Sequence, residues 1–289
     1  MRVLITGSNG QLGSEIRELA ANYKKLDFIF KDLPELDIYN IDALEKFIIN
    51  HKINAVINCA AYTAVDMAED NVEIAKKVNS IGVSNIINIL EKVDGKLIHI
   101  STDYVFNGNH FMPYNESDSV SPIGVYGETK REGELAVINS VLDAIVIRTS
   151  WLYSSYGNNF VKTILRLAKQ KEELSVIFDQ IGTPTYARDL AKTCLEILCG
   201  GISVNISKNG NLYHYSNEGV ASWYDFAISI MKIGGKNCKV KPIQTKDYPT
   251  LAKRPQYSVL NKSKIKTDFK IEIPHWRDSL KDCIEKIIN

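Results

Sequence analysis

The sequence of 289 residues has almost no net charge, with 35 lysines and arginines against 34 aspartates and glutamates. It has no run close to the ~20 consecutive apolar residues that a transmembrane helix needs. The chain reaches Gly7 too early for the apolar part of a signal peptide. We therefore expect neither a nucleic-acid nor a membrane partner. With 45% apolar and 24% charged residues, the composition is that of an ordinary globular protein of one or two domains.

Cysteine and histidine are also scarce, and neither is placed for metal binding. The five cysteines are scattered, and Cys194 and Cys199 are separated by a spacing that no common metal motif uses. The five histidines form no pair at ligand spacing. We therefore expect reduced thiols in a cytoplasmic protein, and no metal site.

The first 150 residues alternate short apolar runs with amphipathic segments. The expected strands are Arg2–Thr6, Phe28–Phe30, Ala55–Asn58, Leu97–Ile100 and Ala144–Ile147. The expected helices are Gln11–Ala21, Ala43–Asn50, Val72–Leu90 and Val125–Val141. Strands that are apolar on both faces and separated by helices indicate a parallel sheet covered on both sides. With right-handed crossovers, this predicts an α/β fold with a doubly wound parallel sheet.

Beyond Trp151 the alternation weakens, and five of the eight prolines lie there. The expected helices are Asn159–Lys169, Arg188–Leu198, Ser222–Lys232 and His275–Ile288, and the expected strands are Leu212–His214 and Val240–Pro242. Eleven basic residues crowd positions 232–270; most suit a solvated face, and one or two could meet an anionic substrate. We predict that residues 151–289 form a smaller α/β substrate-binding region, with some chain crossing back to the first domain.

Three glycines follow the first expected strand and open the first expected helix. Gly7, Gly10 and Gly13 are spaced three residues apart. Glycine permits a tight turn and close approach of a pyrophosphate, while the helix N-terminus offers unpaired N–H groups. This context predicts a Rossmann-like dinucleotide-binding domain over residues 1–150, although a glycine-rich turn without a ligand is the alternative.

The residues after the second expected strand leave the choice between NADH and NADPH open. Asp32 would accept hydrogen bonds from the adenosine ribose, whereas Lys31 could instead meet a 2′-phosphate. Asp37 and Ile38 are expected under the adenine. Either aspartate could equally be an ordinary loop acid or a helix cap.

Tyr126 and Lys130 are four residues apart, which places them on one face of a helix. A nearby ammonium lowers the pKa of a phenol, which is about 10 when unperturbed. Tyr126 could then donate a proton to a substrate oxygen as hydride reaches its carbon. Thr102, at the end of the fourth strand, could bond to the same oxygen, and Asn79 could order a water relay. Together these residues indicate reductase chemistry.

The motifs resemble those of the extended short-chain dehydrogenase/reductases, and more closely their dTDP-4-dehydrorhamnose reductase branch. The matching segments are Gly7–Gly13, Ala60–Asp66, Ser101–Phe106, Val125–Lys130, Arg148–Tyr153, Gly157–Phe160 and Arg254–Pro255. They run in order along nearly the whole chain. The resemblance implies reduction of the C4 ketone of dTDP-4-dehydro-L-rhamnose by NADPH or NADH, the last step towards dTDP-L-rhamnose for cell-surface polysaccharide.

The resemblance also implies a role for each matching residue. The catalytic residues would be Thr102, Tyr126 and Lys130. The cofactor-binding residues would be Gly7, Gly10, Gln11, Leu12, Gly13, Asp32, Asp37, Ile38, Ala60, Ala61, Tyr62, Thr63, Tyr126 and Lys130. The substrate-binding residues would be Thr63, Val65, Thr102, Asp103, Tyr104, Trp151 and Arg254.

The sequence also leaves other functions open, and the resemblance raises the question of a metal site. A related reductase could give the C4 epimer, 6-deoxy-L-talose; an epimerase, a dehydratase or a non-catalytic NADP-binding regulatory subunit are further alternatives. Some members of the family dimerise around Mg²⁺ held by glutamates. Glu15 would be one ligand, but Arg188 and Asp189 stand where a second glutamate is expected. We therefore do not expect this metal site in the protein. We expect a monomer or a homodimer.

Overall fold

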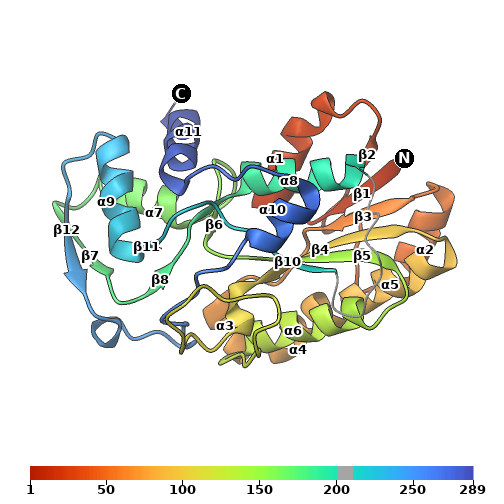
Figure 1. Cartoon of the computed structure of the whole chain (residues 1–289), viewed down its shortest axis with the longest axis horizontal. Coiled ribbons are helices and arrows are strands. Elements are labelled where there is room, and N and C mark those ends of the chain that lie inside the picture. The colour runs from red at the N-terminus through yellow and green to blue at the C-terminus, as the bar shows by residue number, and fades with distance from the viewer. Residues whose placement is uncertain (201–210, 289) are drawn as a thin grey trace.

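The computed structural model describes residues 1–200 and 211–288, and a six-stranded parallel sheet forms its centre (Figure 1). The strands are β1 (Arg2–Thr6), β2 (Asp27–Phe30), β3 (Ala55–Asn58), β4 (Lys96–Thr102), β5 (Asp143–Thr149) and β10 (Leu212–His214). They lie in the order β10-β5-β4-β3-β1-β2. From β1 the chain adds β2 on one side and then β3, β4, β5 and β10 on the other side. In such a sheet, a crevice opens at the carboxyl ends of the strands, at the point where the strand order reverses.

Helices cover both faces of the sheet because its strands are apolar on both sides. Val3 and Ile5 of β1 pack in one core cluster, whereas Leu4 between them packs in another. The first cluster is covered by α1 (Gln11–Leu19), α8 (Ala187–Gly200) and α10 (Ser263–Phe269). The second is covered by α2 (Ile41–Asn50), α5 (Gly82–Lys92) and α6 (Val125–Ile138). The predicted doubly wound α/β fold is therefore confirmed.

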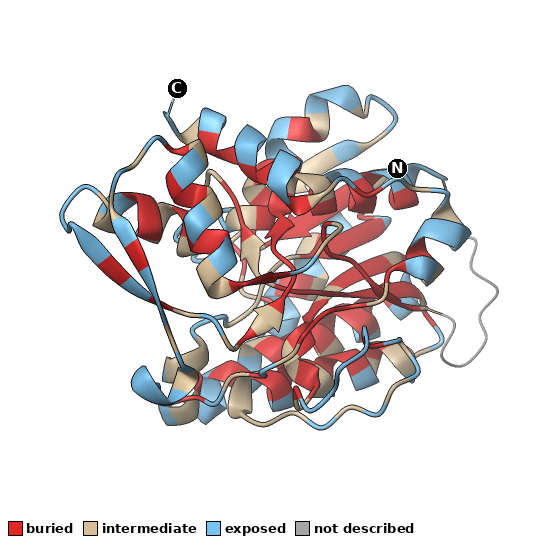
Figure 2. Cartoon of the chain, turned by 60° about the vertical axis from the view of Figure 1, so that its left-hand side comes forward, coloured by how far each residue is buried: buried red, intermediate tan, exposed pale blue. Residues whose placement is uncertain are grey.

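A third core cluster lies beyond one end of the sheet, and Figure 2 shows its buried residues among exposed surface segments. Its elements are α7 (Phe160–Leu167), α9 (Trp223–Ile233), α11 (Trp276–Ile288) and the parallel pair β7 (Glu173–Ile177) and β12 (Lys239–Ile243). Four two-residue strands form two small separate sheets: β6 (Leu152–Tyr153) pairs with β9 (Thr185–Tyr186), and β8 (Ile181–Gly182) pairs with β11 (Ala221–Ser222). Because α8, α10 and β10 come from the second half yet pack on the central sheet, the division near residue 150 stays a prediction.

The helix expected over Val72–Leu90 is divided by a π-turn. It consists of α4 (Val72–Lys76), a π-helical turn over Lys77–Ile81, and α5. The facing helix α6 approaches this turn so closely that a Cβ at Gly133 would lie 2.2 Å from the carbonyl oxygen of Asn79. Periodicity alone could not reveal this interruption, since the apolar spacing continues through it.

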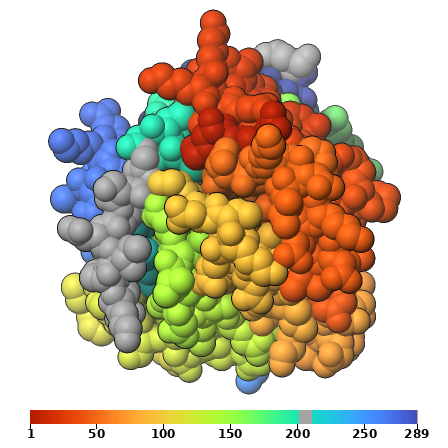
Figure 3. All heavy atoms as spheres, turned by 90° about the vertical axis from the view of Figure 1, so that its right-hand side faces the viewer, coloured from red at the N-terminus to blue at the C-terminus, as the bar shows by residue number. Residues whose placement is uncertain are grey.

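Several short elements were not predicted. They are α10, α3 (Val65–Asp70), the strands β6, β7, β8, β9 and β11, and the single helical turns Asp103–Val105 and Thr245–Asp247. In the view of Figure 3, the surface is formed mainly by residues of the first half of the chain. Within the described residues, no helix is both long enough and apolar enough to span a membrane.

Candidate active site

The carboxyl ends of four neighbouring strands open into a cleft of about 650 Å³, which we call the main cleft. Gly7, Cys59, Thr102 and Ser150 stand at the ends of β1, β3, β4 and β5, and all four line it. The predicted site residues in its lining are Gly7, Gly10, Gln11, Leu12, Ala61, Thr63, Val65, Thr102, Asp103, Tyr104, Tyr126, Lys130 and Trp151. The structure thus gathers in one place residues that are far apart in the sequence.

The glycine loop has the shape of an anion cradle. Gly7 has a φ of +59°, and a Cβ there would lie 2.6 Å from the backbone nitrogen of Ala60. A Cβ at Gly13 would lie 2.5 Å from Cα of Ser8, so neither position accepts a side chain. Gly10 is the N-cap of α1 and brings no side chain to its first N–H groups. These groups can therefore bind a pyrophosphate, and the loop fits a dinucleotide.

Asp32 lies beside this loop, where its Oδ2 accepts a hydrogen bond from the backbone N–H of Asn9, 2.8 Å away. Lys31 forms an ion pair with Glu35. Asp37 accepts from the backbone two residues later, and Ile38 is a core residue that is 5% exposed. The predicted cofactor residues outside the main-cleft lining are Gly13, Asp32, Asp37, Ile38, Ala60 and Tyr62.

The side-chain amide of Asn79, for which a water relay is predicted, is bonded to protein groups. Its Oδ1 accepts from the backbone N–H of Tyr62 at 2.9 Å. Its Nδ2 donates to the Tyr62 carbonyl at 3.2 Å and to the Thr129 hydroxyl at 3.1 Å. Asn79 therefore ties the cleft-lining segment after β3 to helix α6.

Tyr126 and Lys130 lie four residues apart on α6, and both line the main cleft. Glu69 accepts a hydrogen bond from the first N–H of α6 at 3.0 Å and fixes the start of the helix. Further along, the buried carboxylate of Glu134 pairs with Arg148 of β5 through two bonds of 2.7 and 2.9 Å. These contacts hold the helix that carries both side chains against the sheet.

The predicted effect of Lys130 on the acidity of Tyr126 is wrong for this structure. Burial raises the pKa of the Tyr126 phenol to about 12, although a hydrogen bond with Thr102 opposes the shift. Burial lowers the pKa of the Lys130 ammonium to about 8, and this ammonium donates to the Ile100 carbonyl, 2.6 Å away. Desolvation thus dominates the acidity of the Tyr126 phenol, and the phenol keeps its proton at neutral pH.

Thr102, Asp103 and Tyr104 follow the end of β4 as a compact polar group. The Thr102 hydroxyl donates to Oδ1 of Asp103 at 3.1 Å and accepts from the Tyr104 N–H at 3.2 Å. Burial raises the pKa of the Asp103 carboxyl to about 6. The Tyr104 ring meets Tyr126 edge-on, with ring centroids 5.4 Å apart. The four side chains form one polar wall of the main cleft.

Two tryptophans form another wall. Trp151 has a φ of +48°, an uncommon conformation for a bulky residue. Its ring stacks on Trp223 with centroids 3.6 Å apart and planes within 7°. Gly182 lies beneath, where a Cβ would be 2.6 Å from the Trp151 ring. Sequence reasoning did not identify Trp223, which stands in the first turn of α9 next to the capping box of Ser222.

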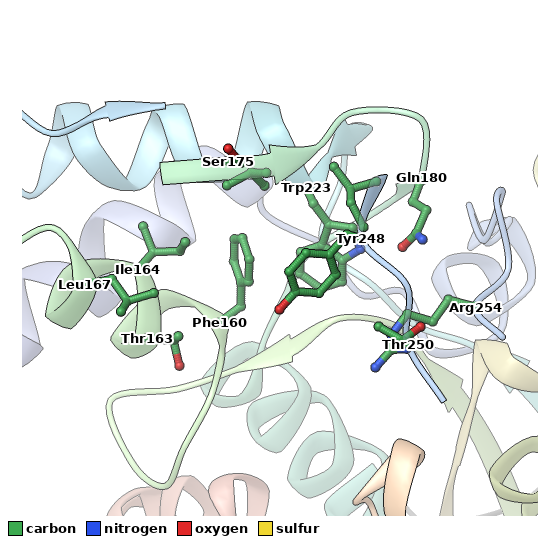
Figure 4. Close-up of a pocket in the computed structure, with 12 residues that line it drawn as sticks. Phe160, Thr163, Ile164, Leu167, Ser175, Gln180, Trp223, Tyr248, Thr250 and Arg254 are labelled. Carbon is green, nitrogen blue, oxygen red and sulfur yellow. The ribbon is translucent and has the colours of Figure 1, made fainter. Parts of the chain in front are cut away.

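A second hollow of about 310 Å³ adjoins the main cleft, and Trp223 lines both. Its apolar side comes from α7 and β7 and includes Ile164 and Leu167. Figure 4 shows Tyr248 and Arg254 opposite this side, on the connecting segment that leaves β12. Arg254, predicted to contact a substrate, thus lines the second hollow rather than the main cleft. The hollow was not predicted, because β7 was not.

Asn159 is a further residue that sequence reasoning missed. Its Nδ2 donates to Oε1 of Gln11 at 3.0 Å, and its Oδ1 accepts from the N–H of Lys162 and caps α7. Its motif, Gly157–Phe160, supported the resemblance but had no role assigned. Asn159 joins the glycine loop to the second half of the chain.

The surroundings of Glu15 do not fit a divalent cation. Its fully buried carboxylate accepts from Ser154 at 2.5 Å and lies 3.3 Å from Arg188 and 3.4 Å from Lys286. Neighbouring Glu18 pairs with the same two cations, and despite burial these hydrogen bonds lower its pKa to about 2. Within residues 1–200 and 211–288, no three acidic, histidine or cysteine side chains cluster as metal ligands. Two protein cations, Arg188 and Lys286, therefore already neutralise the carboxylate of Glu15.

Comparisons with known proteins agree along the full length. Residues 1–289 match the family described as RmlD substrate binding domain. A dTDP-4-dehydrorhamnose reductase of Aggregatibacter actinomycetemcomitans is 42% identical over 287 residues, covering 97% of each chain. The crystal structure of a dTDP-4-dehydrorhamnose reductase from Clostridium acetobutylicum superposes with a TM-score of 0.94, at 42% identity over 100% of both chains. The crystal structure of a Bacillus anthracis dTDP-4-dehydrorhamnose reductase in complex with NADP superposes with a TM-score of 0.92, at 38% identity over 99% of both chains.

Proposed function

This chain belongs to the RmlD substrate binding domain family, and we propose that it reduces the C4 ketone of dTDP-4-dehydro-L-rhamnose to dTDP-L-rhamnose. One observation carries the proposal: Thr102, Tyr126 and Lys130 line a single cleft together with the glycine loop. The relatives at about 40% identity bear the name of this reductase. The product would serve cell-surface polysaccharide synthesis.

The residues around the glycine loop would hold the cofactor. The bare turn from Gly7 to Gly10 and the N-terminus of α1 would bind its pyrophosphate. Asp32, adjacent to the loop, would bind the adenosine ribose, and Lys130 the nicotinamide ribose. When bound, NADPH or NADH supplies the hydride for C4.

Tyr126 would supply the proton. Because the pKa of its phenol is about 12, the O–H is intact at neutral pH and can protonate the C4 oxygen as negative charge develops there. With substrate bound, the Thr102 hydroxyl would turn its single O–H from Asp103 towards the same oxygen and donate a hydrogen bond to it. The Lys130 ammonium would stabilise the phenolate left on Tyr126 until water restores its proton.

The two adjoining hollows would divide the substrate between them. The sugar would lie in the main cleft against Trp151 and Tyr104, with Thr63, Val65 and Asp103 around it. The thymine base would lie in the second hollow between apolar α7 and the rings of Trp223 and Tyr248. Arg254 would face the diphosphate that links the two parts.

The direct test is to incubate the protein with dTDP-4-dehydro-L-rhamnose and NADPH or NADH and to assign the product by NMR. We expect cofactor oxidation and the L-rhamno configuration at C4. The L-talo configuration would contradict the product assignment. Binding of cofactor and dTDP without turnover would instead favour a regulatory subunit. A cytoplasmic location is part of the proposal, since all five cysteines are free thiols.

A further inference from the structure

Asp66 and Arg254 connect two parts of the chain that are 188 residues apart. Asp66 stands in the first turn of α3, and its side chain is 44% exposed. Its Oδ2 accepts from one terminal nitrogen of Arg254 at 2.6 Å, and its Oδ1 from the other at 3.1 Å. Oδ1 also accepts from the backbone N–H of Ala252 at 3.0 Å. These bonds hold the pKa of the Asp66 carboxyl below its ordinary value.

The contact fastens a segment that borders the second hollow. We call residues 248–254 the strap, and it carries Tyr248, Thr250 and Arg254 into the lining of that hollow (Figure 4). The strap follows a helical turn anchored on Asp179, which accepts from the N–H and hydroxyl of Thr245. At the other end, Asp66 joins the strap to the half of the chain that carries Tyr126.

Arg254 keeps part of its hydrogen-bonding capacity. A guanidinium has five N–H donors. Asp66 takes two of them and the Ala252 carbonyl takes a third, at 3.0 Å. Within the described part of the chain, the Nε–H and one terminal N–H have no acceptor. Because Asp66 and Ala252 hold part of the planar guanidinium, its remaining two N–H groups can donate hydrogen bonds to a ligand.

The charged residues that line the two hollows indicate which part of the substrate these N–H donors would bind. Among the described residues that line them, the cations are Lys130 and Arg254. Lys130 lies deep in the main cleft, where its ammonium is bonded to Ile100. Arg254 is therefore the cation on the nucleotide side, and a diphosphate is the anionic part of the proposed substrate.

We propose that Asp66 is a positioning residue, which holds Arg254 and the strap so that the free N–H groups of the guanidinium face the substrate diphosphate. The inference rests on the proposed function. Without the carboxylate, Arg254 would regain rotamer freedom that diphosphate binding would have to remove again. Fixing a long side chain in advance improves affinity by about five- to tenfold.

Two variants of equal charge change test the proposal. Asp66→Asn removes the pair, whereas Asp70→Asn alters an exposed aspartate of the same helix that has no hydrogen bond or ion pair within the described residues. Calorimetric titration of the NADPH-loaded protein with dTDP should give about tenfold weaker binding for Asp66→Asn and no change for Asp70→Asn. Thymidine, which lacks phosphate, should bind both variants as it binds the wild type. KM for the nucleotide sugar should rise about tenfold, with kcat within about twofold.

A double-mutant cycle separates positioning from general structural damage. In an Arg254→Gln background, Asp66→Asn should cost nothing further, because Asp66 acts through Arg254. Unchanged or tighter dTDP binding by Asp66→Asn would overturn the proposal, as would equal losses for dTDP and thymidine. A wild type that does not bind dTDP would overturn it too. If the protein did not turn over the nucleotide sugar but Asp66→Asn still weakened dTDP binding, the proposed reaction would be contradicted and the role of Asp66 supported.

Discussion

Lys130 donates a hydrogen bond from its ammonium to the carbonyl oxygen of Ile100, 2.6 Å away inside the sheet. Burial lowers the pKa of this ammonium to about 8, while the charge of Glu134, one turn along α6, acts in the opposite direction. The ammonium is therefore charged below about pH 8 and loses its charge as the pH rises through that value.

Activity should follow this titration. If the ammonium stabilises the developing phenolate, kcat/KM should fall above about pH 8, by tenfold per pH unit at the limit. Lys130→Arg should keep its charge and remove the alkaline limb, even though its maximum rate is lower. The measurement is the pH dependence of kcat/KM for both proteins. If kcat/KM of the Lys130→Arg variant still fell above about pH 8, the fall would have to be assigned to a group other than Lys130.

Asp103 should reduce stability at neutral pH. Burial raises the pKa of its carboxyl from 3.8 to about 6, so the folded state holds the proton more tightly than the unfolded state. Stability therefore falls as the pH rises between these values, by about 3 kcal/mol in total. Asp103→Asn should exceed the wild type in free energy of unfolding at pH 7.5.

Chemical denaturation at pH 7.5 and at pH 4.5 measures this difference. The gain from Asp103→Asn should shrink at the lower pH, where the wild-type carboxyl is protonated in the fold. Asp70→Asn, which alters an exposed aspartate, should leave stability unchanged at both values. A gain for Asp103→Asn that does not depend on pH would contradict the assigned cause.

Trp223 should affect substrate binding because its ring lines both hollows and stacks on Trp151. Trp223→Ala removes the stack and the shared wall, and KM for the nucleotide sugar should rise by at least about tenfold. Trp223→Phe keeps an aromatic face and should recover most of the loss. Steady-state kinetics with the sugar as the varied substrate would measure both. Equal effects of Ala and Phe would contradict a stacking role.

The enzyme should not depend on a divalent cation. Arg188 and Lys286 already neutralise Glu15 and Glu18, so this pair of carboxylates is not free to bind a metal. Activity and melting temperature should be the same in EDTA and in millimolar Mg²⁺. A loss of activity in EDTA that Mg²⁺ reverses would show that Arg188 and Lys286 do not replace a metal ion.

The central sheet could be predicted because its signals are local. Each early strand is a short apolar run, and Arg2–Thr6 and Ala55–Asn58 have the predicted bounds. The glycine loop was likewise recognisable, since Gly7 must fill a positive-φ turn directly after β1. Tyr126 and Lys130 share a helix face by spacing alone. These features depend on neighbours in sequence and on periodicity, which a single sequence displays.

Other features depend on tertiary contacts and could not be read from the chain. Strand β7 is only five residues long and is buried at two alternate positions, so its pairing with β12 decides its form. The second hollow forms only once that pair packs on α7. The acidity of Tyr126 was misjudged because residue spacing does not reveal burial, which raises the pKa of the phenol. The contacts of Asn79 could not be predicted because its partner Tyr62 comes from another segment.

The role of Tyr126 as proton donor is tested most directly by measuring NADPH oxidation by wild type, Tyr126→Phe and Tyr104→Phe with dTDP-4-dehydro-L-rhamnose. Tyr126→Phe should lose about 10²- to 10⁴-fold in kcat while binding NADPH and dTDP normally. Tyr104→Phe, which removes a second phenol from the same cleft wall, should lose far less. A Tyr126→Phe variant as fast as the wild type would contradict the assignment of the proton donor.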